Sequence, residues 1–542
     1  MNDPNLPPIN QDSNEEQKSG NMYSYNEDIR NTNNHKEFEN GAIRRSLGEG
    51  NPNADFPIPN NNLEIKRNTI NNEPVKIVNS QYYVDNNTNG SNNSILHWAY
   101  CMIYILIEAL LILFIGLFYR YDNRLKPEYF FVNSVIEKAA GYDFDTFYGI
   151  FRDINIMVFV GFGMLHTLYT NYSKTSISIN ILAIALSVQV GLLTNLMWED
   201  AFKEIRRNGI INFTTYIKAI LNASTIIVSL GCVLGKLSII QYLIMIIIET
   251  IMSSLNFQLC HVKLRIVDTG GSLYVHTFGT IFGLAIYMVF FCSTKMKNTL
   301  KSFSSYNTSN YFSNVTSFIG VLFLWIYFPS FNCSLTWNDK TRYYAVISTY
   351  LSLAGSLVTT FITSALYNKG RFVIEHILFS SFSGGVIISG CCSVCIDFWS
   401  ALLIGCLSGV ISVTFLKYVK PYFIKWGFDD FFNVIIIHGI PGLLGAFITP
   451  MMISGIARRR DDLNDFIFDD REAGPQAGIQ IGAIFITIGL SFISGIATGY
   501  LMKVSSCGKI VNYFKDIEFF EDEENGENQV NFINHITKST GH

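Results

Sequence analysis

Two histidines, each set in an apolar stretch beside glycines, are the residues of this sequence whose types are best suited to chemistry. His276 lies in the stretch VHTFG that begins at Val275, and His438 lies in the stretch IHGIPG that begins at Ile437. Two neutral imidazoles that share a hydrogen bond leave one outward donor and one outward acceptor. Either histidine alone is more typical of a structural hydrogen bond between helices. As a pair, the two rings would be able to handle a small polar molecule.

The elements that carry these histidines are predicted to be membrane-spanning helices. Of the 542 residues 49% are hydrophobic and only 15% are charged, which is too apolar for a soluble globular chain. A run of about 20 apolar residues matches the thickness of a bilayer core. We predict an all-α polytopic membrane protein with about twelve spans, near residues 96–119, 150–170, 177–197, 210–234, 237–259, 271–293, 311–332, 343–367, 372–396, 397–419, 431–454 and 476–502.

Two further patterns link the histidines. Small residues follow each at helical spacing, Gly279 and Gly283 after His276, and Gly442 and Gly445 after His438, so the two helices are expected to approach closely. The histidines fall in the sixth and eleventh runs, and this offset fits a pseudo-twofold, inverted repeat of two five-helix halves.

Other ionisable side chains in or near the runs are candidates because a charge is costly in hydrocarbon. They are Glu108, Lys218 and Glu249 within the runs, and His166, Asp268 and His376 near their ends. We expect replacement of either central histidine to have a much larger functional effect than replacement of His166 or His376.

The ends of the chain differ in composition from the middle. Residues 1–94 are rich in Asn and poor in large aliphatics, which predicts a disordered tail, and residues 504–542 form an acidic tail that is most simply solvated. The cysteine cluster Cys391, Cys392 and Cys395 lacks a second pair at zinc spacing, so packing is favoured over a metal site. A net charge of −4 gives no basic field for a nucleic acid.

Four segments together resemble the Rhesus (Rh) branch of the ammonium transporter superfamily, over roughly residues 96–502. They are DINIMVFVGFG from Asp153, DTGGS from Asp268 leading into the first histidine stretch, WIYFPSFN from Trp325, and HGIPG from His438. The resemblance implies a homotrimer of twelve-helix protomers with both termini cytoplasmic, and the absence of an obvious retention signal favours the plasma membrane. Each protomer would hold a narrow hydrophobic pore for ammonia or ammonium, with methylammonium as a further candidate permeant. It implies no enzyme activity, cofactor or metal.

The resemblance also implies roles for individual residues. His276 and His438 match the family's pore-lining pair, Asp268 matches an acidic residue that holds the vestibule end of the first histidine helix, and Phe331 matches one of two stacked phenylalanines at the gate. Leu221 stands where the second gate phenylalanine is usual, which predicts a looser gate. Glu249 stands where a neutral residue is usual.

Three kinds of function stay open at this point. The first is an ammonia channel, in which ammonium loses its proton at the pore and for which carbon dioxide is a second candidate permeant. The second is a secondary transporter of another small solute that uses Glu249 or Lys218 for ion coupling. The third is a non-conducting structural membrane protein. The two histidines and Phe331 favour the first, because a structural protein has no need of polar groups in its lumen.

Overall fold

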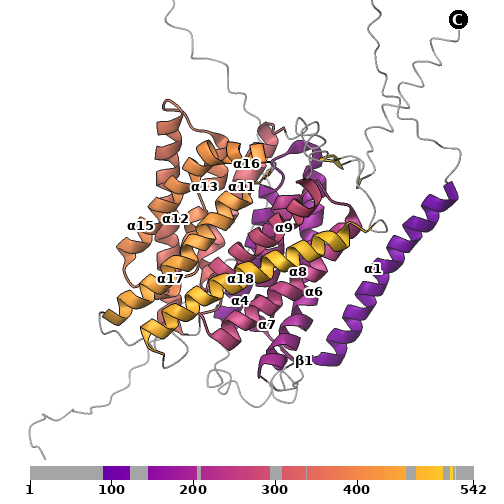
Figure 1. The fold of residues 1–542 in the computed structure, drawn as a ribbon, viewed down its shortest axis with the longest axis horizontal. Helices are drawn as coiled ribbons and strands as arrows, with labels where there is room; N and C mark the ends of the chain where they lie inside the picture. Colours follow the sequence, from indigo (N-terminus) through magenta and orange to yellow (C-terminus); the bar gives the residue numbers. More distant parts are fainter. Residues whose placement is uncertain are drawn as a thin grey trace, which may run out of the picture. The chain divides into compact units, whose positions relative to one another are not determined.

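The computed structural model describes residues 90–121, 144–203, 209–292, 308–336, 338–426, 428, 430, 432–458, 471–504, 513–516 and 519–520, and these are mostly helical (Figure 1). The α-helices are α1 (Gly90–Phe118), α4 (Phe144–Asn155), α5 (Gly163–Leu165), α6 (Ser173–Lys203), α7 (Phe213–Val233), α8 (Ile239–Gln258), α9 (Phe278–Phe291), α11 (Tyr311–Asn332), α12 (Asp339–Tyr367), α13 (Ile374–Ser380), α14 (Ser383–Ile388), α15 (Phe398–Thr414), α16 (Lys420–Trp426), α17 (Ile440–Arg458) and α18 (Ala473–Met502). Short π-helices and 3-10 turns adjoin them, namely η2 (Ile156–Phe162), η3 (Thr170–Tyr172), η4 (Leu259–Leu264), η5 (Ser272–Thr277), η7 (Cys392–Val394), η8 (Phe415–Val419) and η9 (Ile435–Gly439).

Eleven helices in the described part of the chain are long and apolar enough to cross a membrane. Each predicted run except 372–396 overlaps one of them, and the run predicted at 311–332 has the same limits as α11. The agreement follows from hydropathy, because in hydrocarbon only a helix satisfies every backbone group of a single spanning segment. The chain is therefore a multi-pass membrane protein.

The run 372–396 was predicted as one continuous helix, and this is wrong. The structure breaks it into α13 and α14, followed by the 3-10 turn η7. At the break the Ser380 carbonyl accepts hydrogen bonds from the hydroxyls of Ser356 (2.9 Å) and Ser383 (2.8 Å). These hydroxyls take the place of a helical N–H, so the interruption leaves the carbonyl satisfied inside the bundle.

Polar caps begin several of the long helices. Asn212 begins α7, Ser238 begins α8 and Asn310 begins α11, each with a capping box in which the side chain accepts from the backbone N–H three residues on. These contacts satisfy N–H groups that have no partner within the helix. They fix the N-terminal ends of these three helices.

Small residues bring neighbouring helices together. The pairs α12 with α15, α6 with α7, and α9 with α18 pack along one another (Figure 1). A Cβ on Gly405 of α15 would lie 1.9 Å from the Ser352 carbonyl oxygen of α12, and one on Gly355 of α12 would lie 2.5 Å from the Leu402 carbonyl oxygen of α15. Such backbone contact supplies the close packing that holds helices together in lipid.

A two-stranded parallel ladder departs from the all-α prediction in a minor way. Strand β1 (Tyr119–Tyr121) pairs with β2 (Gly209–Ile211), which joins the end of α1 to the segment before α7. The Tyr119 hydroxyl donates to the Leu192 carbonyl oxygen at 2.6 Å, so the ladder is also tied to α6.

The predicted tails fall largely outside the described residues, but their boundaries differ from those expected. Helix α1 starts at Gly90, inside the predicted tail 1–94. Within the predicted tail 504–542, Phe514 is fully buried and Asp516 caps α6 by accepting from the backbone N–H of Lys174 (3.1 Å) and Thr175 (2.7 Å). This short segment is part of the packed structure, whereas the acidic stretch at 521–524 lies outside the described residues.

Candidate functional site

His276 and His438 form a buried pair. Their Nδ1 atoms lie 3.1 Å apart, and their rings are nearly parallel, at 11°, with centroids 5.1 Å apart. The side chains are 1% and 4% exposed. One Nδ1–H donates to the other Nδ1, which leaves one Nε2 as an acceptor and the other as a donor. The prediction that the two rings face each other is confirmed.

His276 is held on the π-helical turn η5. The turn follows Gly271, whose φ of 80° is in the left-handed region that glycine adopts without strain. Asp268 Oδ2 accepts from the backbone N–H groups of Leu273 (2.9 Å) and Tyr274 (3.2 Å). Asp268 thus caps the turn that carries His276, in line with the structural role expected of it.

His438 sits on a matching turn, η9. Asp430 Oδ2 accepts from the backbone N–H of Ile435 at 2.8 Å. Asp430 precedes His438 by eight residues, the same spacing that separates Asp268 from His276. This repeated spacing of aspartate and histidine is visible in the sequence and would have predicted Asp430 as the counterpart of Asp268.

Burial acts on both capping aspartates in the same direction. It raises the pKa of Asp268 to about 7, against the opposing effect of the backbone hydrogen bonds. Burial also raises the pKa of Asp430, and the nearby ammonium groups of Lys236 and Lys420 oppose that rise. Both carboxyls lie in the short segments before the π turns.

Aromatic rings enclose the histidine pair. The ring of His276 lies 6.2 Å from that of Phe328 and 6.3 Å from that of Phe331. The ring of His438 lies 5.9 Å from Phe162 and 6.0 Å from Phe382. The imidazole nitrogens are therefore the polar atoms of an otherwise aromatic and aliphatic environment.

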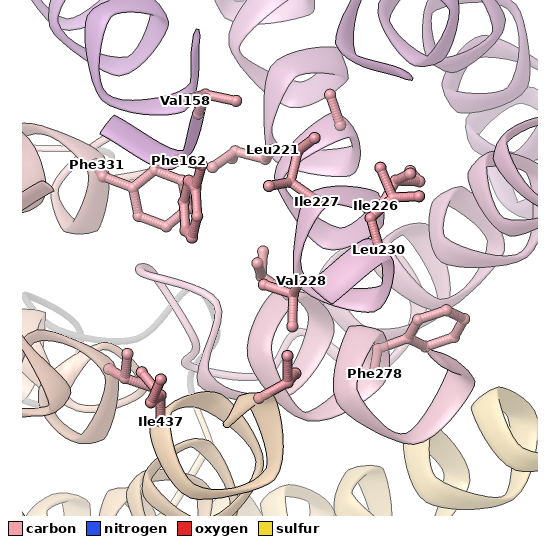
Figure 2. Close-up of a cluster of buried hydrophobic side chains, with 14 of the residues drawn as sticks. Val158, Phe162, Leu221, Ile226, Ile227, Val228, Leu230, Phe278, Phe331 and Ile437 are labelled. Carbon is pink, nitrogen blue, oxygen red and sulfur yellow. The ribbon is translucent and has the colours of Figure 1, made fainter. Parts of the chain in front are cut away.

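The residues predicted to form a gate lie in one hydrophobic cluster. Phe331 and Leu221 are both buried in it, together with Phe162 and Val228. Figure 2 shows Leu221 and Val228 extending from α7 toward the rings of Phe162 and Phe331. Phe162 was not singled out from the sequence, because its distance from His438 along the chain gives no sign that their rings pack together, at 5.9 Å.

The predicted glycine faces serve two different contacts. A Cβ on Gly442 would lie 3.0 Å from the His276 Cβ, so this glycine does bring the two histidine segments together. Gly279 and Gly283 instead pack on α7, where a Cβ would lie 2.6 Å from the Thr225 carbonyl oxygen and 2.7 Å from the Ser229 carbonyl oxygen, respectively. The two histidine segments do approach closely, as expected, but Gly442 contributes to that contact whereas Gly279 and Gly283 do not.

A small cavity of about 10 Å³ adjoins His438. Its lining is mainly apolar, with His438 and His166 as the two titratable members: Phe162, Leu165, His166, Ile227, Val228, Phe432, Val434, Ile437 and His438. His166 and His376 were grouped as residues whose replacement should matter less than that of the central pair, but only His166 borders this cavity. His376 lies in α13, 3.1 Å from the Ser364 hydroxyl, and is not part of this cavity.

The remaining ionisable candidates do not join the site. Lys218 Nζ lies 3.7 Å from Glu199 Oε2, and both side chains are partly exposed. Glu108 is an exposed residue of α1 to which the Gln189 amide donates at 3.4 Å. Glu249 is fully buried in α8 and contacts the Ser229 hydroxyl.

The cysteine cluster packs behind the turn that carries His276. Cys391, Cys392 and Cys395 are all buried, and Cys392 Sγ lies 3.1 Å from Thr269 Oγ1. Within the described ranges no group of three His, Cys, Asp or Glu side chains is placed to hold a metal ion.

The fold and the site define a polytopic membrane protein built around a buried histidine pair. The model of the Ammonium Transporter Family matches residues 132–510. The chain is 30% identical over 455 residues to ammonium transporter Rh type B of Danio rerio, covering 81% of this chain and 97% of that protein. It is 28% identical over 452 residues to ammonium transporter Rh type C of Canis lupus familiaris, covering 81% and 96%. The chain belongs to the Rh branch of the ammonium transporter family.

A solved structure supports the fold independently. The Rh50 protein of Nitrosomonas europaea superposes with a TM-score of 0.58 at 24% identity, covering 73% of this chain and 97% of that one. The chain therefore shares its fold with this Rh50 protein.

Proposed function

We propose that this chain is a channel for ammonia, which arrives as ammonium, releases its proton to water on the side of entry and passes as ammonia through a narrow pore lined by His276 and His438. The observation that carries the proposal is the 3.1 Å contact between two buried imidazoles in an aromatic enclosure. The names of the Rh type B and type C relatives, and the family of the matching model, support ammonium as the permeant.

The enclosure explains selectivity through the cost of desolvation. A hydrated ion that reached the apolar constriction at Phe331 and Leu221 would have to shed water, and a bare cation in a low-dielectric site costs several kcal/mol. Neutral ammonia avoids that cost. Sodium and potassium have no proton to lose, so the same constriction excludes them.

The histidine pair compensates for the water that ammonia leaves behind. The Nε2 that carries a proton donates to the ammonia lone pair, and the bare Nε2 accepts an ammonia N–H. Hydrogen bonds between ammonia and the imidazoles take the place of those that ammonia made to water, and this keeps the free-energy barrier to ammonia passage low. Phe162 lies in the same hydrophobic cluster as Phe331 and Leu221 and packs on His438 at 5.9 Å, so it adds an aromatic ring to the enclosure of the pair.

The setting proposed for the channel is a homotrimer in the plasma membrane with both termini cytoplasmic. We count the broken segment α13–α14 as a twelfth crossing beside the eleven long helices, and an even number of crossings would place both termini on one side. The relatives and structural neighbours are Rh and ammonium transport proteins of the same architecture, which supports this assembly.

Ion coupling through Lys218 or Glu249 is less well supported. Lys218 is engaged with Glu199 and lies at a partly exposed helix end. Glu249 contacts Ser229, on the side of α7 that faces α8 and α9. Neither side chain reaches the histidine pair.

The test is ammonia conduction by the purified protein in proteoliposomes. An inward ammonium gradient should raise the internal pH faster than in protein-free vesicles, because entering ammonia binds protons inside. Equal rates in the two preparations would refute the proposed function. An equal sodium gradient is the control and should give no pH change.

A further inference from the structure

The cavity beside His438 ends at a third imidazole. His166 lines it, and its ring packs at 4.7 Å from the ring of Phe432 and at 6.1 Å from that of Phe162. The side chain is 4% exposed. Phe162 also packs on His438, at 5.9 Å, so a single aromatic ring is in contact with both imidazoles.

Asn180 fixes the tautomer of His166. The Asn180 amide Nδ2–H donates to His166 Nδ1 at 2.8 Å. A neutral ring that accepts at Nδ1 carries its proton on Nε2. His166 is thereby prepared as a hydrogen-bond donor through Nε2.

The Nε2 atom points toward the face of α7 that borders the cavity. A Cβ on Gly231 would lie 3.9 Å from His166 Nε2, 3.6 Å from the Phe432 Cβ and 2.6 Å from a methyl group of Val434, and these three residues all line the cavity. Within the described residues, the hydrogen bond made by the His166 ring is the one from Asn180 to Nδ1. A buried N–H without an acceptor is costly, so this geometry favours an acceptor in the cavity.

We propose that His166 is a second binding subsite for ammonia, in which its Nε2–H donates to the ammonia lone pair beyond the His276–His438 pair. The inference rests on the proposed channel function and deepens it. A volume of about 10 Å³ is close to the space that one water-sized molecule requires, and ammonia is of that size. Water and small amines share the lone-pair chemistry, and the experiment separates them.

The subsite changes how the conduction path works. Ammonia leaving the histidine pair would otherwise enter a space bounded by Phe162, Val228 and Phe432, with loss of all hydrogen bonds. A donor at His166 lowers the barrier at that step. The imidazoles of His276, His438 and His166 therefore lie along one path, and the ring of Phe162 packs on both His438 and His166.

The test compares two substitutions of matched length, His166→Gln and His166→Met. Gln keeps a donor and Met does not, so conduction should fall about threefold to tenfold in His166→Met, which is the effect of one neutral hydrogen bond, and stay within about twofold of wild type in His166→Gln. The control is His376→Met, a buried histidine outside the cavity, which should conduct as wild type. Equal conduction by the Gln and Met variants would overturn the subsite.

A binding measurement keeps the inference testable if His166→Met fails to fold. In the wild-type protein labelled with ¹⁵N-histidine, the Nε2 resonance that is lost in His166→Gln should shift on addition of ammonium chloride and not on addition of sodium chloride. An unchanged resonance would overturn the subsite, and a shift with both salts would indicate only water or ionic strength and overturn it too. If wild type conducts and these tests fail, only the subsite is refuted; if wild type does not conduct, the channel proposal fails as well.

Discussion

Asp268 offers a test of how the π turn positions His276. Its carboxylate accepts from the backbone N–H groups of Leu273 and Tyr274, at 2.9 and 3.2 Å. Substitution of Asp268 by Ala leaves both buried groups without an acceptor, at about 1–3 kcal/mol each. The same substitution also removes a buried carboxyl oxygen, Oδ1, that has no hydrogen-bond partner, and this stabilises the folded state by about 1–3 kcal/mol. The expected net loss is therefore about 1–3 kcal/mol.

The assay is thermal unfolding of the purified protein in detergent, together with conduction in proteoliposomes. Asp268→Ala should melt several degrees lower and conduct poorly, because a loosened turn displaces His276 from its 3.1 Å contact with His438. Asp268→Asn keeps an acceptor oxygen and should retain most of both properties. The control is Asp339→Ala, whose carboxylate is 98% exposed and should tolerate the change. Wild-type melting and conduction in Asp268→Ala would refute the reasoning.

The same carboxyl predicts a pH dependence of stability. Burial raises the folded-state pKa of Asp268 from 3.8 to about 7, so the folded protein holds a proton that the unfolded chain releases above about pH 4. The stability associated with that proton is fully present below pH 4 and is lost as the pH rises through about 7. The melting temperature of Asp268→Asn, which cannot ionise, should fall less than that of wild type between pH 4 and 8. A parallel fall in both proteins would contradict the assignment.

Substitutions at two further positions, Gly442 beside the pair and Glu249 in α8, give separate tests. Gly442→Val places a side-chain carbon 3.0 Å from both the His276 Cβ and the Ser272 carbonyl oxygen, so overpacking should cost about 1–3 kcal/mol of stability and conduction should be lost. The control is Gly455→Val, whose side chain would face open space and which should conduct normally. Equal conduction by the two variants would contradict the contact between Gly442 and His276. The Ser229 hydroxyl has one proton for three contacts, namely Glu249 and the carbonyl oxygens of Gly279 (2.7 Å) and Thr225 (3.3 Å), so it needs a neutral partner at Glu249. Glu249→Gln should therefore melt and conduct as wild type, while Glu249→Ala should melt lower. Loss of conduction in Glu249→Gln would instead favour ion coupling.

The spans could be predicted because they depend on local sequence, whereas the pairing of His276 with His438 was predicted from the offset of their runs and from the family resemblance. Hydropathy over about 20 residues reports directly on what a bilayer accepts, so α11 was predicted to the residue. The run 372–396 is equally apolar, but its break depends on the Ser356 hydroxyl, which α12 supplies from outside the run. Periodicity within a segment contains no information about such a partner.

The third imidazole was missed for the same physical reason. His166 gains its role from Asn180, which fixes its proton, and from Phe432, which packs on its ring from a distant part of the chain. Seen alone near a helix end, it has the pattern of an ordinary structural histidine. By contrast, the eight-residue spacing from Asp268 to His276 and from Asp430 to His438 is visible in the sequence, and aligning the two histidine stretches on each other would have found it.

The most direct measurement of the central claim is conduction by variants of the paired histidines. Under an inward ammonium gradient, His276→Ala and His438→Ala should each either conduct far less ammonia than wild type or admit sodium, whereas His376→Ala should match wild type in both respects. The double variant should behave much like either single one, because the two rings act through one shared hydrogen bond. Wild-type conduction and sodium exclusion in both single variants would contradict the account.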